Sequence, residues 1–308
     1  MLKLGAIDIG TNSMRMIIAK IENGAIVKSS KLLNTTRMGQ NVDQTGILAD
    51  EAMDRNIHAL KEFMEIAKKE KIKKLPIIAT SAVRDAKNKA IFIKRAKEEA
   101  NVSVDVINGQ REAELGFVGV LKGLERDDEN ILVIDIGGGS TEFILGNKEG
   151  IKHLISINIG AVRMTEKFIT TDPVSKKEIE YMEKAIEDKI KDTIHSLCKF
   201  KIDRVIGIGG TATTIAAVSK RMKVYDKEKI HQTNLSHEKV KKTLDEFLSK
   251  NLEDRKKVDG LQPKRADIII AGTIILDRIL KGIQMDYITI SEYDNLEGLI
   301  FEQLGVKP

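Results

Sequence analysis

The feature that most constrains this chain is a segment that occurs twice. Residues 4–10 read Leu-Gly-Ala-Ile-Asp-Ile-Gly, and residues 131–137 read Ile-Leu-Val-Ile-Asp-Ile-Gly. Each is a short apolar run that ends in a carboxylate and a glycine, which is typical of a buried strand entering a turn. Asp8 and Asp135 are 127 residues apart, and the small polar residues after them match at the same offset. A repeat of this length predicts two similar domains rather than a solenoid.

The pattern around the repeat predicts an α/β fold. In both copies a second β-like run, a turn signal and a third strand follow the first, and helices then alternate with strands. Three antiparallel strands followed by such alternation predict a mixed sheet covered by helices. The length of 308 residues fits two domains. The predicted helices are 50–71, 88–100, 109–123, 175–200 and one from about 295, and the later strands are 75–79, 102–107, 204–208 and 287–290.

Charge and composition exclude several classes of partner. Lys and Arg number 51 against 46 Asp and Glu, a net charge of +5 that favours an anionic partner. The excess is too small for a dedicated nucleic-acid binder, the lysines are spread over helix faces, and only 4% of residues are aromatic. We therefore expect no DNA partner.

The apolar segments do not indicate a membrane protein. The longest apolar run, residues 268–276, is nine residues and too short to span a bilayer. Asp8 interrupts the apolar start, which argues against a signal peptide. Cys198 is the single cysteine, so an internal disulfide is excluded. We expect a cytoplasmic protein with no membrane partner.

The turns after the two repeated strands are suited to phosphate. Glycines let the backbone approach an anion and direct N–H groups toward it, and the hydroxyls of Thr11, Ser13 and Ser140 add donors. Asp8 and Asp135 would repel phosphate unless a divalent cation lay between them. A single such turn is equally explained as a tight hairpin capped by its own carboxylate. Two of them, facing each other across a cleft, would hold a phosphate chain from both sides.

A third glycine segment, residues 207–211, follows a predicted strand and precedes a helix expected near Thr213. The helix dipole would make it an anion site, although a purely structural strand-to-helix turn explains it too. It is not Gly-x-Gly-x-x-Gly, and no Walker lysine–hydroxyl pair follows any glycine turn. Rossmann and P-loop folds are therefore not favoured.

Two further segments carry groups that phosphate cleavage would need. Ser81 and Arg84 follow a buried strand, and a guanidinium can bind phosphate oxygens with two hydrogen bonds. Glu112 and Glu114 lie near the start of a predicted helix, where a carboxylate could orient and deprotonate water. An Arg after a strand is also often a surface ion pair, and a Glu in a first helical turn often only compensates the dipole. Composition alone does not rank Glu112 above Glu114.

Six motifs in order resemble the exopolyphosphatase / guanosine pentaphosphate phosphohydrolase (Ppx/GppA) family over nearly the whole chain. They are Asp8-Ile-Gly-Thr-Asn-Ser-Met-Arg15, Ala79-Thr-Ser-Ala-Val-Arg-Asp85, Gln110-Arg-Glu-Ala113, Asp135-Ile-Gly-Gly-Gly-Ser-Thr-Glu142, Gly160-Ala-Val-Arg163 and Gly207-Ile-Gly-Gly-Thr211.

The resemblance implies two duplicated ribonuclease-H-like domains of the actin, Hsp70 and sugar-kinase type, with mixed five-stranded sheets around a central cleft. It gives an N-terminal domain at 1–124 and a C-terminal domain at 125–294. The helix at about 295–308 would pack back on the first domain, and a hinge near 121–128 would open and close the cleft.

The resemblance also implies hydrolysis of a terminal phosphoanhydride, in inorganic polyphosphate or in pppGpp, with Mg²⁺ or Mn²⁺. Glu112 would position the attacking water, with Arg84 and Glu142 as further catalytic residues. The metal would be held by Asp135, Asp8 and Glu142. The residues expected to bind phosphate are Asp8, Gly10, Thr11, Asn12, Ser13, Arg15, Ser81, Gly137, Gly138, Gly139, Ser140, Thr141, Gly209, Gly210 and Thr211.

The chain departs from the family pattern at two places. Many relatives read Leu-Arg-Glu-Gly-Leu near the C-terminus, where this chain has Asn295-Leu296-Glu297-Gly298-Leu299. Any contact made by that arginine is therefore expected to be absent. The chain ends at Pro308, without the helical HD-type domain of longer members. We expect a preference for short polyphosphate or a groove built by a homodimer.

Two other functions fit the same motifs. A phosphotransferase of the same superfamily would use the third glycine segment for a nucleotide and transfer phosphate to an acceptor other than water. A regulator that binds polyphosphate or guanosine penta- and tetraphosphate with little turnover would keep the same phosphate turns. Glu112 discriminates, because its removal should abolish turnover and leave ligand affinity nearly unchanged.

Overall fold

A computed structural model describes residues 2–124 and 129–306. The chain forms two compact units, one of residues 1–119 with 295–308 and one of residues 120–294. The division falls inside helix α5 (Gly109–Gly123) and again at the start of helix α13 (Asn295–Gln303). Residues 125–128 of the predicted hinge lie outside the described residues.

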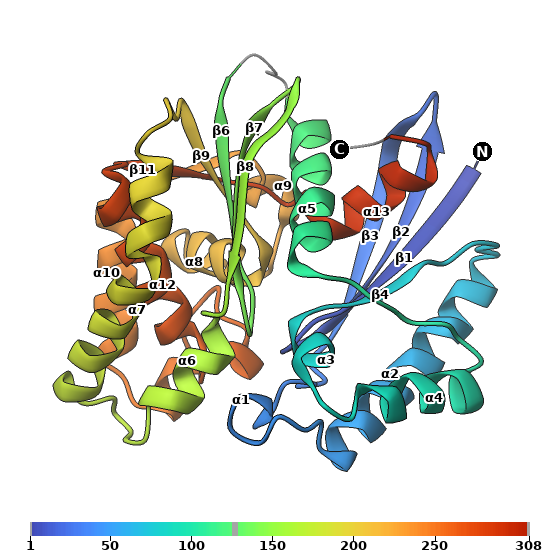
Figure 1. Cartoon of the computed structure of the whole chain (residues 1–308), viewed down its shortest axis with the longest axis horizontal. Helices are drawn as coiled ribbons and strands as arrows, with labels where there is room; N and C mark the ends of the chain where they lie inside the picture. Colours follow the sequence, from blue (N-terminus) through green and yellow to red (C-terminus); the bar gives the residue numbers. More distant parts are fainter. Residues whose placement is uncertain (1, 125–128, 307–308) are drawn as a thin grey trace. The chain divides into compact units, whose positions relative to one another are not determined.

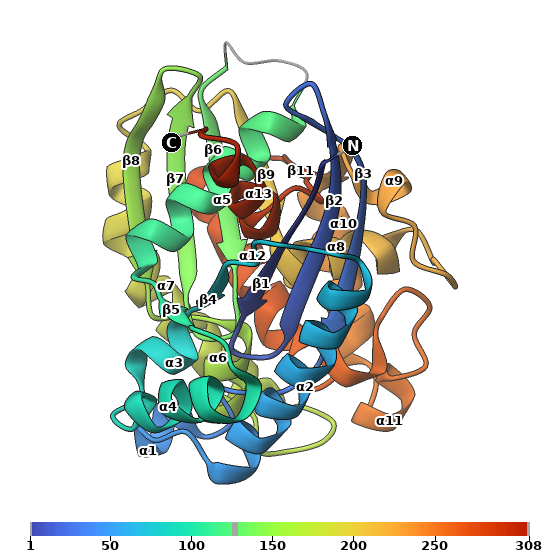
Figure 2. The same ribbon diagram turned by 90° about the vertical axis from the view of Figure 1, so that its right-hand side faces the viewer.

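The first unit contains a mixed five-stranded sheet in the order β3-β2-β1-β4-β5 (Figure 1). The first three strands are antiparallel and run side by side in Figure 2, whereas β4 and β5 are parallel to β1. This is the three-strand meander followed by parallel strands that the sequence predicted. The elements are β1 (Leu2–Ile9), β2 (Met14–Glu22), β3 (Ala25–Asn34), α1 (Val42–Thr45), α2 (Asp50–Lys69), β4 (Ile77–Ala79), α3 (Ser81–Asp85), α4 (Lys89–Ala100), β5 (Asp105–Val106), α5 and α13.

Alternation along the strands gives this sheet two buried faces. Ile7 and Ile9 of β1 point into one apolar cluster, which they share with Leu60 of α2. Leu4 and Ala6 point to the opposite face and pack with residues of α5 and α13. Because successive side chains of a strand point to opposite faces, Asp8 lies on the face of Leu4 and Ala6, which α5 and α13 cover.

Helix α13 is held in the first unit by close packing and one buried charge. Gly298 lies against the backbone of Leu115 in α5, where a Cβ would be 2.7 Å from the carbonyl carbon. The buried Glu297 carboxylate forms an ion pair of 2.9 Å with Lys31 of β3. Leu296 is fully buried in the apolar cluster of this face. The position at which many relatives have arginine is therefore a core position in this chain.

The second unit repeats the sheet and adds a strand. Its order is β10-β11-β9-β6-β7-β8, so β8-β7-β6-β9-β11 matches β3-β2-β1-β4-β5. The sequence predicted five strands, and the sixth is β10 (Thr233–Ser236), which pairs antiparallel with β11 (Tyr287–Ile290). The other elements are β6 (Ile131–Ile136), β7 (Thr141–Asn147), β8 (Gly150–Ile157), α6 (Ala161–Phe168), α7 (Lys176–Leu197), β9 (Arg204–Ile208), α8 (Gly209–Ser219), α9 (Lys227–Ile230), α10 (His237–Leu248), α11 (Leu252–Arg255), the 3₁₀ helix Pro263–Arg265 and α12 (Ile269–Ile283).

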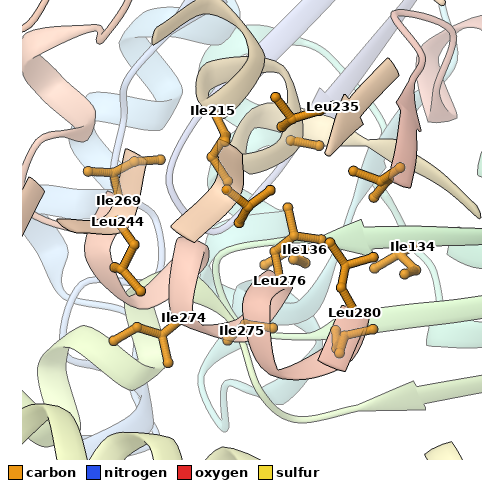
Figure 3. Close-up of a cluster of buried hydrophobic side chains, with 14 of the residues drawn as sticks. Ile134, Ile136, Ile215, Leu235, Leu244, Ile269, Ile274, Ile275, Leu276 and Leu280 are labelled. Atoms are coloured by element: carbon orange, nitrogen blue, oxygen red, sulfur yellow. The ribbon is translucent and has the colours of Figure 1, made fainter. Parts of the chain in front are cut away.

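The core of the second unit is built around α12. Its apolar residues pack with Ile134 and Ile136 of β6, and with Ile215 of α8 and Leu244 of α10 (Figure 3). Residues 268–276 contain no charged side chain, which is why this part of the sequence forms a long apolar run. Among residues 2–124 and 129–306, no helix combines the length and apolarity needed to cross a bilayer.

One carboxylate organises the start of α7. Ser175 is the N-cap of this helix and forms a capping box with Glu178. The Glu178 carboxylate accepts hydrogen bonds from the backbone amides and hydroxyls of Thr170, Thr171 and Ser175. These donors, the Thr171 hydroxyl first among them, hold the pKa of Glu178 well below its ordinary value.

Glu178→Gln tests this pH linkage. Because the pKa of Glu178 is depressed in the folded chain, its ionised form stabilises the fold above the unfolded pKa of about 4.3, and this contribution is lost as the pH falls below that value. We expect the variant to be less stable than the parent at pH 7 and to lose less stability on acidification. Urea unfolding at pH 7, 5 and 3.5 measures this, with Glu180→Gln on the same helix as control. An equal loss on acidification in Glu178→Gln and the parent would contradict the account.

Candidate functional site

The first repeated turn joins β1 to β2 and is closed by its own backbone. Gly10 N–H donates to the Ser13 carbonyl at 3.1 Å. Thr11, Asn12 and Ser13 are buried although they are polar. The Thr11 and Ser81 hydroxyls lie 2.8 Å apart, so the turn and the start of α3 meet. The structure therefore brings together the first predicted phosphate turn and the Ser81 segment.

Asp8 and Arg15 are direct partners on β1 and β2. They form one register pair of the antiparallel ladder, and the Arg15 guanidinium donates to Asp8 Oδ2. Directly opposite residues of a ladder point to the same face of the sheet, which accounts for the contact. Asp8 Oδ1 is buried and has no hydrogen-bond partner among the residues that the structure describes. One oxygen of this carboxylate is thus paired, and the other is available to a ligand.

Arg84 and Glu112 form the second polar contact of this unit. Arg84 Nη1 donates to Glu112 Oε2 at 3.0 Å and to the Ile107 carbonyl at 3.3 Å. Glu112 is 8% exposed, whereas the neighbouring Glu114 interacts with Gln110 and Arg111 on the exposed side of α5. Composition could not rank Glu112 and Glu114 as candidates for orienting water. In the structure, Glu112 is the buried one of the two.

The second repeated turn has the same closing bond. Gly137 N–H donates to the Ser140 carbonyl at 3.0 Å, which is the Gly10–Ser13 bond displaced by 127 residues. Ser140 and Thr141 are buried. The Thr141 hydroxyl donates to the Ile159 carbonyl at 2.7 Å, so it anchors the segment that follows β8.

Asp135 and Glu142 occupy the register positions that Asp8 and Arg15 hold in the first unit. They are direct partners on β6 and β7, and Glu142 is paired in turn with Ser156 of β8. The Ser156 hydroxyl donates to Glu142 Oε1 at 2.8 Å, and Glu142 is 1% exposed. The repeat thus places an acid–base pair in one unit and two acids in the other.

The third glycine segment differs from the prediction. The sequence predicted a turn before a helix near Thr213, but α8 begins at Gly209, directly after β9. Gly209 has a φ of +76°, which glycine adopts without strain, and its Cα lies against the Asp135 carboxylate. Gly210 and Thr211 are therefore in the first helical turn. The Thr211 hydroxyl donates to the Ile136 carbonyl at 3.1 Å.

Arg265 is a candidate site residue that the sequence motifs did not predict. Its guanidinium lies directly over Gly210, where a Cβ would collide with it. The available signal in the sequence was the basic pair Lys264–Arg265 directly after Pro263, which the structure places in the 3₁₀ helix Pro263–Arg265. Arg265 adds a fixed cation to the start of α8 within the second unit.

The described residues offer a limited set of metal ligands. No group of three or more His, Cys, Asp or Glu side chains within residues 2–124 and 129–306 could hold a metal ion. Mg²⁺ commonly takes one or two carboxylates and completes its shell with water and substrate phosphates. Within the second unit, the neighbouring Asp135 and Glu142 carboxylates fit that chemistry because both are hard oxygen donors. Within the first unit, the buried Asp8 Oδ1 is a donor of the same kind.

Comparison with known proteins decides the family. The model of the Ppx/GppA phosphatase family matches residues 17–306. The chain belongs to the Ppx/GppA phosphatase family.

Relatives of this Ppx/GppA protein cover nearly all of its length. A bifunctional 3-dehydroquinate synthase/phosphatase of Fusobacterium nucleatum is 43% identical over 307 residues, which are 96% of this chain and 46% of that protein. The chain thus spans about half the length of that relative. Exopolyphosphatase 2 of Mycobacterium tuberculosis is 29% identical over 316 residues, 98% of this chain and 99% of that protein. The crystal structure of an exopolyphosphatase from Cytophaga hutchinsonii is 31% identical, with a TM-score of 0.91 over 99% of both chains.

Proposed function

We propose that this chain hydrolyses the terminal phosphoanhydride of inorganic polyphosphate or of pppGpp. Membership of a phosphatase family with relatives named exopolyphosphatase supports phosphoanhydride hydrolysis. The observation that carries the mechanism is the Arg84–Glu112 contact of 3.0 Å, in the unit that holds the first phosphate turn. It joins a group that binds phosphate to a group that orients water.

Arg84 has two tasks in this mechanism. Its guanidinium fixes one carboxylate oxygen of Glu112, Oε2, by a charge-assisted hydrogen bond. Its remaining N–H groups can donate to phosphoryl oxygens, on which charge is spread in the transition state. Because the Ile107 carbonyl also accepts from Nη1, the side chain is held in place before substrate binds. Such fixed donors stabilise developing charge without reorganisation.

Glu112 orients the attacking water and accepts its proton. Because Arg84 holds Oε2, the Glu112 carboxylate has a fixed orientation, and a water molecule that it binds is held in a defined direction. Within each unit the backbone amides of the glycine turn would bind phosphate, and the Ser81 and Thr11 hydroxyls add donors in the first unit. Phosphoryl transfer requires mainly this positioning and charge stabilisation.

The exchange of Arg15 for Glu142 at matching positions supports the proposal of a metal site in the second unit. In the first unit the arginine already neutralises Asp8, whereas in the second unit two carboxylates are neighbours on adjacent strands. We assign Mg²⁺ or Mn²⁺ to Asp135 and Glu142 within the second unit. Asp8 Oδ1 is an oxygen donor of the same kind within the first unit. When bound, the cation would neutralise phosphate charge and polarise the scissile anhydride.

Cytoplasmic location and a homodimer stay predictions of the sequence. The following experiments distinguish hydrolysis from the two alternative functions, a phosphotransferase and a regulator with little turnover.

Glu112→Gln tests the catalytic role. The amide keeps the size of the side chain but cannot take a proton, so we expect kcat to fall by about 10²- to 10⁴-fold while ligand affinity is retained. The assay is phosphate release with Mg²⁺ from tripolyphosphate, long polyphosphate, pppGpp and ATP. Glu114→Gln, on the exposed side of the same helix, is the matched control.

The outcomes of this assay separate the functions. Unchanged release in Glu112→Gln would overturn the mechanism. Binding without release from any substrate in the parent would indicate a regulator. Consumption of ATP without free phosphate, when an alcohol or carboxylate acceptor is supplied, would indicate a phosphotransferase.

Glu142→Gln tests the metal assignment. Loss of one carboxylate charge beside Asp135 should raise the Mg²⁺ concentration for half-maximal phosphate release by at least about 10-fold. Titration of Mg²⁺ and of Mn²⁺ measures the shift, and Glu149→Gln in the exposed turn between β7 and β8 serves as control. An unchanged metal dependence in Glu142→Gln would place the cation elsewhere.

A further inference from the structure

The segment Gly160–Arg163 is a motif of the sequence to which the proposed mechanism gives no part. It forms the start of α6, with Gly160 as N-cap and no side-chain cap. The first amides of a helix have no partner within the helix. Here they donate to the second phosphate turn: Ala161 N–H to the Gly137 carbonyl at 2.9 Å, and Val162 and Arg163 N–H to the Gly138 carbonyl at 2.9 and 3.1 Å.

The Arg163 side chain extends this contact by one residue. Its Nε donates to the Gly139 carbonyl at 2.7 Å. Three successive carbonyls of the turn, those of Gly137, Gly138 and Gly139, are therefore bound by the start of α6. In a trans peptide the C=O of one residue and the N–H of the next point in opposite directions. The N–H groups of residues 138–140 are consequently directed away from α6, as an anion-binding turn requires.

The contact is close enough to require glycine. A Cβ on Gly160 would lie 2.5 Å from the backbone nitrogen of Gly139 and would collide with the Gly138 carbonyl. The segment therefore reaches the turn backbone to backbone. This leaves Arg163 as the part of the contact that depends on a side chain.

In the first unit, backbone hydrogen bonds from a neighbouring segment also hold the phosphate turn in place. There the segment after the third strand donates Arg37 N–H to the Asn12 carbonyl and Gly39 N–H to the Thr11 carbonyl, both at 2.9 Å. A Cβ on Gly39 would collide with the Thr11 side chain. Asn12 and Gly139 correspond in the repeat, so a backbone amide performs in the first unit what the Arg163 guanidinium performs in the second.

We propose that Arg163 is a positioning residue for catalysis: by binding the Gly139 carbonyl it fixes the amides of the second phosphate turn toward the substrate. This inference rests on the proposed function, since it assigns the turn to a phosphate chain. Arg163 acts through the turn and is distinct from Arg84, which donates to phosphoryl oxygens itself.

The test compares Arg163→Met, which removes the donor, with Arg163→Lys, which keeps a cationic donor. Arg221→Met is the control, because Arg221 is an exposed arginine of the same unit that pairs with Glu246. Two readouts are taken at a temperature where circular dichroism shows each variant folded. One is kcat and KM for tripolyphosphate with Mg²⁺, and the other is amide hydrogen exchange in the peptide that contains residues 137–141.

We expect Arg163→Met to lower kcat/KM by about 10- to 100-fold, mainly through kcat, because donors that stabilise transition-state charge lose their alignment. Exchange at residues 137–141 should become faster, Arg163→Lys should be intermediate in both readouts, and Arg221→Met should match the parent. If Arg163→Met does not fold, Arg163→Lys against the parent carries the comparison.

The two readouts separate this inference from the proposed function. Normal turnover and normal exchange in the folded Arg163 variants would overturn the inference and leave the function standing. A parent that releases phosphate from no substrate would overturn the proposed function. In that case, faster amide hydrogen exchange at residues 137–141 in Arg163→Met would still show that Arg163 fixes the turn. Unchanged exchange would overturn that role.

Discussion

In each unit one backbone hydrogen bond closes the turn after the central strand, from Gly10 to Ser13 and from Gly137 to Ser140. The bond fixes where the strand ends and how the next one returns, and so it sets the ladder register that makes Asp8 face Arg15 and Asp135 face Glu142. The face of the sheet then follows from alternation. The position of the charged groups in each unit depends on this turn.

The two copies of the repeat share the same strand pairing but differ in the charge of one side chain beside the aspartate. An aspartate is the last residue but one of β1 and of β6, but its ladder partner is an arginine in the first unit and a glutamate in the second. The first unit therefore carries a paired carboxylate together with the Arg84–Glu112 contact, and the second carries a site suited to a cation. The same backbone arrangement therefore carries different charged groups in the two units.

The sequence predicted the parts that depend on local pattern. The duplicated strands, the turn after each of them and the alternation of helices and strands follow from apolar periodicity and glycine placement. It missed β10, because Thr233–Ser236 is short, mostly polar and paired only at the edge of the sheet. It also placed the start of α8 too late, because Gly209 and Gly210 favour a turn in sequence terms, whereas the structure uses them at a helix start beside Asp135 and Arg265. The distinct environments of Glu112 and Glu114 and the contact of Arg163 with Gly139 depend on tertiary packing, which no local pattern encodes.

The central claim is that water attacks the terminal phosphorus atom. The most direct measurement is turnover of tripolyphosphate with Mg²⁺ in H₂¹⁸O, followed by mass spectrometry of both products. If water attacks the terminal phosphorus atom, each released orthophosphate contains one ¹⁸O atom and the pyrophosphate contains none. Label in the pyrophosphate, or orthophosphate without label, would contradict attack of water at the terminal phosphoryl group.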